Sequence, residues 1–120
     1  MQLLVTKEKQ MNIYSPEMGF IDIAFANLDV SFAIALARYK CAEKIAEIQV
    51  KTKQLESAGN TSFKQPEWTT REEEIKTLAT RFDNLYKLVD AAATEDNKNE
   101  LHEITKQLIK LLNTQLKTIQ

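Results

Sequence analysis

The sequence has few of the residues that make tight turns, because glycine and proline occur only twice each among its 120 residues. Average proteins contain about 7% glycine and about 5% proline. Folds rich in β-structure need many turns, and turns depend largely on these two residues. The chain is rich instead in Glu, Lys, Gln, Leu and Ala, which are strong helix formers. We therefore expect an all-α protein.

The sequence also lacks cysteine pairs and a secretion signal. Cys41 is the single cysteine, so no intramolecular disulfide can form, and we expect it to be a small buried hydrophobe. Residues 1–15 show no helical period and do not have the basic start and run of ~7–15 apolar residues of a signal peptide. We read them as an N-terminal arm and expect a cytoplasmic protein, with non-classical secretion left open.

There is no excess of charge of either sign. Sixteen basic side chains nearly balance seventeen acidic ones, whereas nucleic-acid binders usually show a basic excess. The most apolar stretch, 20–37, contains Asp22 and Asp29. Each carboxylate would cost ~2.5–3.5 kcal/mol at the centre of a bilayer. We therefore expect neither a nucleic-acid partner nor a membrane span.

The periodicity of the apolar residues predicts one long helix over 16–58. Ser15 and Pro16 are typical of a helix start, and Gly59 with Asn60 is typical of a helix end. A helix of about 40 residues is ~60 Å long. Its predicted buried stripe recurs at steps of three and four: Ile21, Phe25, Leu28, Phe32, Leu36, Tyr39, Ala42, Ile45, Ile48 and Leu55.

Two further helices are predicted over 70–93 and 97–119. Thr69 or Thr70 would cap the first and Asn97 the second, each with Glu three residues later. The short link between them predicts an antiparallel hairpin. The predicted stripes are Ile75, Leu78, Phe82, Leu85 or Tyr86 and Val89, and then Leu101, Ile104, Leu108, Leu111 or Leu112, Gln115 and Ile119.

Signatures of catalysis and metal binding are missing from the sequence. His102 is the only histidine, and one histidine cannot build a multi-histidine zinc site. We expect it to be solvated near the start of its helix. A haem site would need Met11 or Met18 opposite His102. The two glycines are too far apart for a phosphate loop, and we expect no enzyme activity, catalytic residue, metal or cofactor.

The predicted long helix outreaches the hairpin by about 25 Å, which leaves two architectures open. If the helix is continuous, a three-helix bundle forms and the apolar segment 20–37 needs another chain to cover it. Asp22 and Asp29 would then share a polar edge of that interface. If the helix breaks near 27–31, where Asn27, Asp29 or Ser31 can cap a new helix, a four-helix bundle hides the segment. We favour the continuous helix, because neither Pro nor Gly occurs between Phe20 and Ala58.

These patterns indicate a non-enzymatic helical module for self-association or for capture of a partner protein. The predicted anchors are Phe20, Ile21, Phe25, Leu28, Phe32 and Leu36. In size and pattern the chain resembles small helical subunits and chaperones of bacterial secretion machines, or phage-encoded inhibitors, although no motif assigns it to a family. The alternative is a small bundle that binds haem or a lipid-like ligand between its helices.

Overall fold

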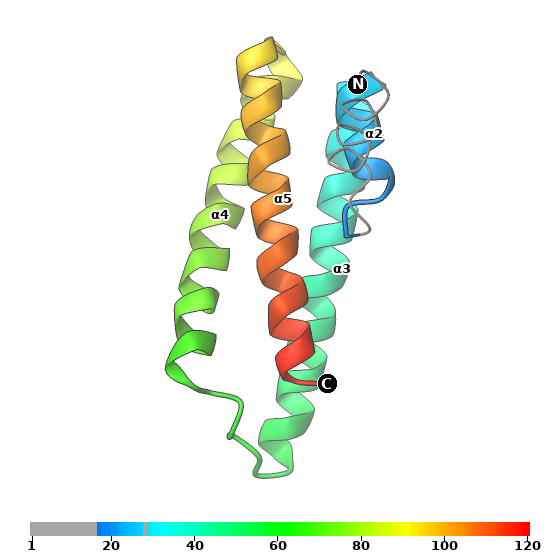
Figure 1. Cartoon of the computed structure of the whole chain (residues 1–120). Coiled ribbons are helices and arrows are strands. Elements are labelled where there is room, and N and C mark those ends of the chain that lie inside the picture. The colour runs from blue at the N-terminus through cyan, green and yellow to red at the C-terminus, as the bar shows by residue number, and fades with distance from the viewer. Residues whose placement is uncertain (1–16, 28) are drawn as a thin grey trace, which may run out of the picture.

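The computed structural model describes residues 17–27 and 29–120. This part of the chain contains four helices: α2 (Phe20–Asn27), α3 (Val30–Ser57), α4 (Pro66–Ala91) and α5 (Glu95–Thr118) (Figure 1). The predicted all-α class is therefore confirmed. The predicted N-terminal arm, 1–15, lies outside the described residues.

The continuous first helix that we favoured is wrong, because α2 and α3 are separate helices. Asp29 caps α3 with extended backbone angles, and its side chain accepts a hydrogen bond of 2.8 Å from the backbone N–H of Ser31. This short-range bond satisfies one of the free donors at the new helix start. The break lets α2 fold back beside the first half of α3 (Figure 1), as in the four-helix alternative.

The loop after α3 forms where the sequence indicates it. Gly59 has a φ of 78°, a left-handed conformation that favours glycine, and the backbone N–H of Asn60 bonds back to the carbonyl of Leu55. Phe63 and Trp68 are buried and meet edge to face with ring centroids 5.0 Å apart. Together with Leu116 and Ile119 they form a second apolar cluster, at the end of the bundle where the loop links α3 to α4.

Both helices of the hairpin begin earlier than predicted. Proline stands at the first position of α4, where its missing N–H is harmless, and Gln65 rather than Thr69 or Thr70 is the N-cap. Thr94 rather than Asn97 caps α5. Asn97 sits three residues later and completes a capping box, its side chain accepting from the Thr94 N–H while its own N–H donates to the Thr94 hydroxyl.

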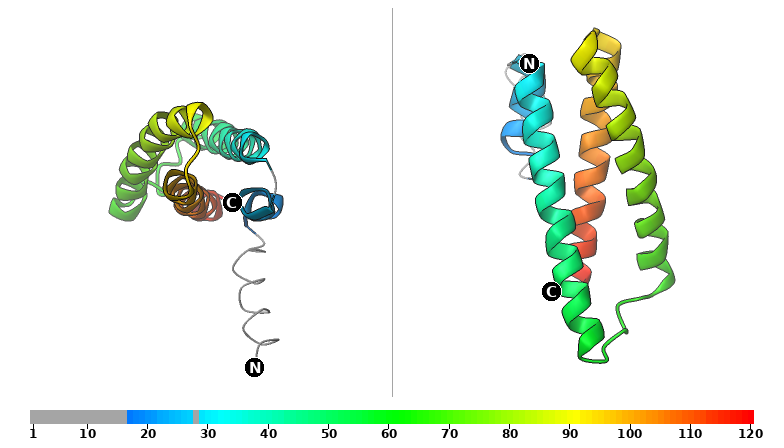
Figure 2. Two further views of the ribbon diagram at one scale, coloured as in Figure 1. Left: turned by 90° about the horizontal axis from the view of Figure 1, so that it is seen from above. Right: turned by 180° about the vertical axis from the view of Figure 1, so that it is seen from behind.

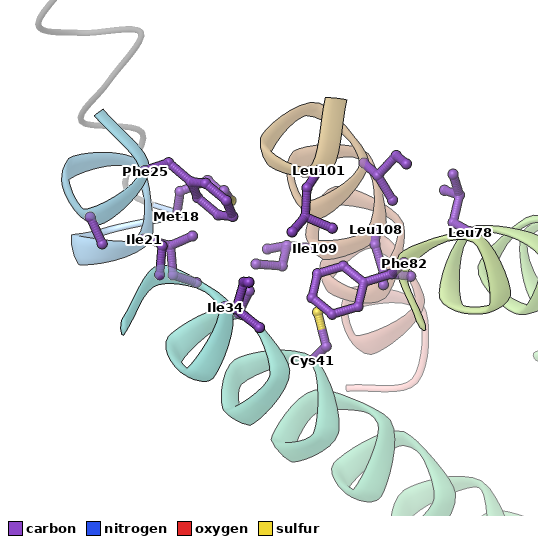
Figure 3. Close-up of a cluster of buried hydrophobic side chains, with 14 of the residues drawn as sticks. Met18, Ile21, Phe25, Ile34, Cys41, Leu78, Phe82, Leu101, Leu108 and Ile109 are labelled. Carbon is purple, nitrogen blue, oxygen red and sulfur yellow. The ribbon is translucent and has the colours of Figure 1, made fainter. Parts of the chain in front are cut away.

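Helix α5 is the centre of the bundle, since it packs against each of the other three helices (Figure 2). Helices α3 and α4 share only a small contact. Both predicted stripes of the hairpin are confirmed as buried or half-buried. Side chains from all four helices meet in one apolar cluster (Figure 3). Its members include Ile21, Phe25, Ile34, Cys41, Phe82, Leu101, Leu108 and Ile109.

The buried face of α3 differs from the predicted stripe. The residues that pack inward are Ala33, Ile34, Ala37 and Cys41, which we call the inner face. Phe32, Tyr39 and Ala42 of the predicted stripe are exposed, whereas four other members of it are half-buried against the core: Leu36, Ile45, Ile48 and Leu55. The two inner alanines are fully buried. Small side chains at these two positions allow close packing of neighbouring helices against α3, and the side that carries Phe32 and Tyr39 is left outward.

Candidate interaction surface

The outward side of α3 carries a second apolar stripe, which we call the outer seam. It consists of Phe32, Ala35, Tyr39, Ala42, Ala46 and Val50, all of which are exposed. Phe32 is 50% exposed and Tyr39 68%. Steps of three and four residues place these side chains on one face, in the spacing of a coiled-coil seam. Helix α3 is thus apolar on two opposite sides.

Helix α2 adds Phe20 to this surface. Its side chain is 73% exposed, and it lines a cleft of about 340 Å³ together with Leu36, Tyr39, Lys40 and Glu43 of α3. The backbone before it turns through Gly19, whose φ is 54°. Phe20 therefore flanks the outer seam at the level of Tyr39 and Lys40.

A second hollow flanks the seam on its other side, between α3 and α4. It has a volume of about 410 Å³, and Tyr39, Ala42, Ile45, Ala79 and Phe82 are among its lining residues. Next to it, the Arg38 guanidinium lies 4.7 Å from the centre of the Tyr86 ring. Tyr39 lines both hollows and so forms a ridge between them.

The structure separates the six residues that the sequence grouped as anchors. Ile21 and Phe25 are in the core, each 3% exposed, while Leu36 is half-buried. Phe20 and Phe32 are exposed, and Leu28 lies outside the described residues. Tyr39, which we assigned to the core, belongs to the outward surface. The break at Asp29 resets the helical phase, and periodicity alone does not decide which side of α3 faces outward.

His102 is not the solvated histidine that we expected. Its Nε2 atom lies 2.6 Å from a carboxylate oxygen of Asp22, and its ring stacks on Phe25 with centroids 4.6 Å apart. Asp22 is fully buried. The predicted polar edge formed by Asp22 and Asp29 is also wrong, because Asp22 faces α5 and Asp29 caps α3. The sequence signal was Asp22 beside the stripe residues Ile21 and Phe25, but its partner is remote in sequence.

Cys41 is the buried hydrophobe that we predicted. Its side chain points toward Phe82 in the core (Figure 3). Burial raises the pKa of the Cys41 thiol to about 11, against a smaller lowering by the nearby Lys44 ammonium. The group is consequently a neutral thiol at physiological pH, and its environment is not that of a reactive cysteine.

The described residues offer no grouping of three or more His, Cys, Asp or Glu side chains suited to a metal ion. Among the described helices, none has a stretch long and apolar enough to span a bilayer. Comparisons with protein-family models, curated proteins and solved structures return no match. What bears on function is therefore the exposed surface of the described residues.

Proposed function

We propose that the protein is a helical interaction module that binds another polypeptide through the exposed apolar surface of α2 and the first half of α3. Of the sequence-predicted anchors, Phe20, Phe32 and Leu36 belong to this surface, and Tyr39 joins them. Ile21 and Phe25 are left out because they belong to the core. The proposal includes self-association as well as capture of a helical partner.

The observation that carries this proposal is the exposure of three aromatic rings close together. Phe20, Phe32 and Tyr39 are each at least half exposed. Phe20 and Tyr39 line one cleft, and Phe32 is two helical turns before Tyr39 on the same face of α3. Single exposed apolar residues are ordinary, but contiguous apolar patches mark interaction sites. Aromatic side chains are also the commonest anchors of protein interfaces.

Site-specific photocrosslinking inside the cells that make the protein tests this proposal. A photoreactive phenylalanine analogue replaces Phe32 in one sample and Leu88 in another. Leu88 is a matched control because it is 62% exposed but lies on α4. We expect a discrete crosslinked adduct from position 32 that weakens when Phe20→Glu is added, and none from position 88. An absence of adducts from position 32 would contradict the proposed function.

The haem or lipid alternative has less support, because the Nε2 atom of His102 is engaged by Asp22 rather than presented to a ligand. Met18, one of the two methionines considered as an axial ligand, is a buried member of the core. The visible absorption spectrum of the purified protein tests the haem version directly. A Soret band would support haem binding, and a featureless visible spectrum would leave the interaction module as the better hypothesis.

A further inference from the structure

We infer that the occupant of the outer seam is a second copy of this chain, packed antiparallel through α3 about a two-fold axis that passes near Lys40 and Cys41. This inference rests on the proposed function and deepens it by naming the partner. It goes beyond apolar exposure, because the order of large, small and charged residues from Ala35 to Ala46 is complementary to its own reverse, whereas Phe32 at the end of the seam would face Gln49.

The spacing of the seam suits a paired helix. Phe32, Tyr39 and Ala46 are seven residues apart, and Ala35 and Ala42 form a second series between them. These are the two core positions of a heptad, which together follow one side of a helix. From Phe32 to Val50 the seam extends ~27 Å along α3.

The order of sizes favours an antiparallel pair. In antiparallel pairs one heptad core position faces the other, so Tyr39 of each copy meets Ala42 of the second copy, and Ala35 meets Ala46. The large ring is then accommodated beside a small side chain, and the alanine pair permits close approach. A parallel pair would instead place Tyr39 against Tyr39. Because one patch meets itself, the interface closes as a dimer rather than growing into a filament.

Charge points to the same arrangement. Lys40 and Glu43 are on the α2 side of the seam, where both line the cleft beside Phe20. A two-fold axis between the helices keeps this side on the same side in both copies, so Lys40 of one copy approaches Glu43 of the other, twice. A two-fold axis along a parallel pair would instead put this side on opposite faces of the dimer, so Lys40 and Glu43 of the two copies would not meet. Phe20, at the level of Lys40, comes close to its own counterpart across the axis.

The test measures the mass of the purified full chain in solution by sedimentation, over concentrations from about 1 µM to about 1 mM, a range that includes weak interfaces. We expect a reversible species of twice the 13.8 kDa chain mass. Ala42→Glu places a carboxylate at the centre of the seam and should raise the dissociation constant at least ~100-fold. Leu88→Glu, on α4, should leave it unchanged, and circular dichroism should show native helix content in both variants.

Charge reversal tests the orientation. Lys40→Glu should weaken the dimer roughly tenfold, because two attractive contacts become repulsive, and Glu43→Lys should do the same. The double variant Lys40→Glu with Glu43→Lys restores the opposite pairs and should return the dissociation constant to within about threefold of the wild-type value. A parallel pair predicts no such recovery.

The outcomes separate this inference from the proposed function. A chain that is monomeric throughout the range, or a dimer that Ala42→Glu leaves intact, overturns the second copy as occupant. If position 32 still gives an adduct with a different polypeptide in cells, the proposed function survives and only the partner is wrong. If position 32 gives no adduct and the purified chain is monomeric, both fail.

Discussion

The two faces of α3 have similar apolar composition but opposite environments. The inner face, with Ala33, Ile34, Ala37 and Cys41, is enclosed by α2, α4 and α5. The outer seam has aromatic rings and alanines at comparable spacing and faces solvent. The difference shows that the amount of apolar surface does not decide which side of a helix becomes the core. The side of α3 that becomes the core is the one that α2, α4 and α5 cover, so tertiary contacts rather than the composition of α3 decide it.

This comparison predicts that the same substitution has very different effects on the two faces. Ala37→Glu puts a longer, charged side chain into a fully buried site, so we expect it to cost about 4 kcal/mol or more and to leave the chain largely unfolded. Ala35→Glu, two residues away on the exposed seam, should change the free energy of unfolding by no more than about 0.5 kcal/mol. Urea denaturation followed by circular dichroism measures both. Equal losses would show that the two faces are not distinct.

The next largest expected effect on the free energy of unfolding concerns the contact that holds α2 against α5. Asp22→Ala removes the buried partner of His102, and we expect a loss of about 2–3 kcal/mol because a polar group at the α2–α5 contact is left unsatisfied. His102→Ala and the double variant complete a cycle that isolates the coupling between the two side chains. Chemical denaturation of the four proteins provides the values. A coupling energy near zero would mean that the contact does not hold α2 in place.

The reaction rates of cysteine thiols on the inner face and on the outer seam of α3 compare how accessible these two faces are. Cys41 is buried and its pKa is raised from 9.0 to about 11, so at neutral pH its thiolate fraction is ~100-fold lower than that of a free thiol. At a concentration where the chain is monomeric, the exposed cysteine made by Ala42→Cys in a Cys41→Ala background should react with a thiol reagent at least ~100-fold faster. The rates are followed by absorbance. Similar rates for both proteins would contradict the burial of Cys41.

The same pKa shift has a consequence for stability. Because the pKa is higher in the folded chain, folding favours the protonated thiol. The stability that the protonated Cys41 thiol contributes is fully present at pH values below the unfolded-state pKa near 9.0. It is lost as the pH rises through the folded-state pKa of about 11. The wild type should therefore lose stability over this interval relative to Cys41→Ala. Parallel pH profiles for the two proteins would show that the thiol is not responsible.

The smallest expected effect on stability concerns the junction between α2 and α3. Asp29→Ala removes the side-chain cap of α3, and we expect a loss of about 1 kcal/mol. Asp29→Ser retains a capping oxygen and should recover most of it. Thermal unfolding compares the two variants. A loss equal for both would mean that capping does not maintain the break between α2 and α3.

Much of the hairpin could be predicted from sequence, because its evidence is local. The stripes of α4 and α5 have a single phase, and every predicted position from Leu101 to Ile119 is buried or half-buried. Both helices start earlier than predicted, because Pro66 is the first residue of α4 and Thr94 is the N-cap of α5. These errors concern a single turn and leave the packing unchanged.

The first half of the chain was harder to predict, because its outcome depends on tertiary contacts. A stripe through Phe32 and Tyr39 and one through Ala33 and Ala37 are both helical, and periodicity alone cannot rank them. The contact between Asp22 and His102 joins residues 80 positions apart, and it forms only once the chain turns between α2 and α3. Of the six predicted anchors, Phe20 and Phe32 are therefore exposed, two others are core residues, and the exposed Tyr39 was omitted.

The most direct test of the outer seam as a self-association surface is disulfide trapping in a mixture of Ala35→Cys and Ala46→Cys chains, both in the Cys41→Ala background, because the proposed two-fold axis places position 35 of one copy opposite position 46 of the other. The account predicts rapid formation of a covalent dimer under mild oxidation, at concentrations where Leu88→Cys in the same background remains monomeric. Equal and slow crosslinking of the mixture and of Leu88→Cys would contradict it, because the seam would then meet a second copy no more often than an ordinary exposed position on α4 does.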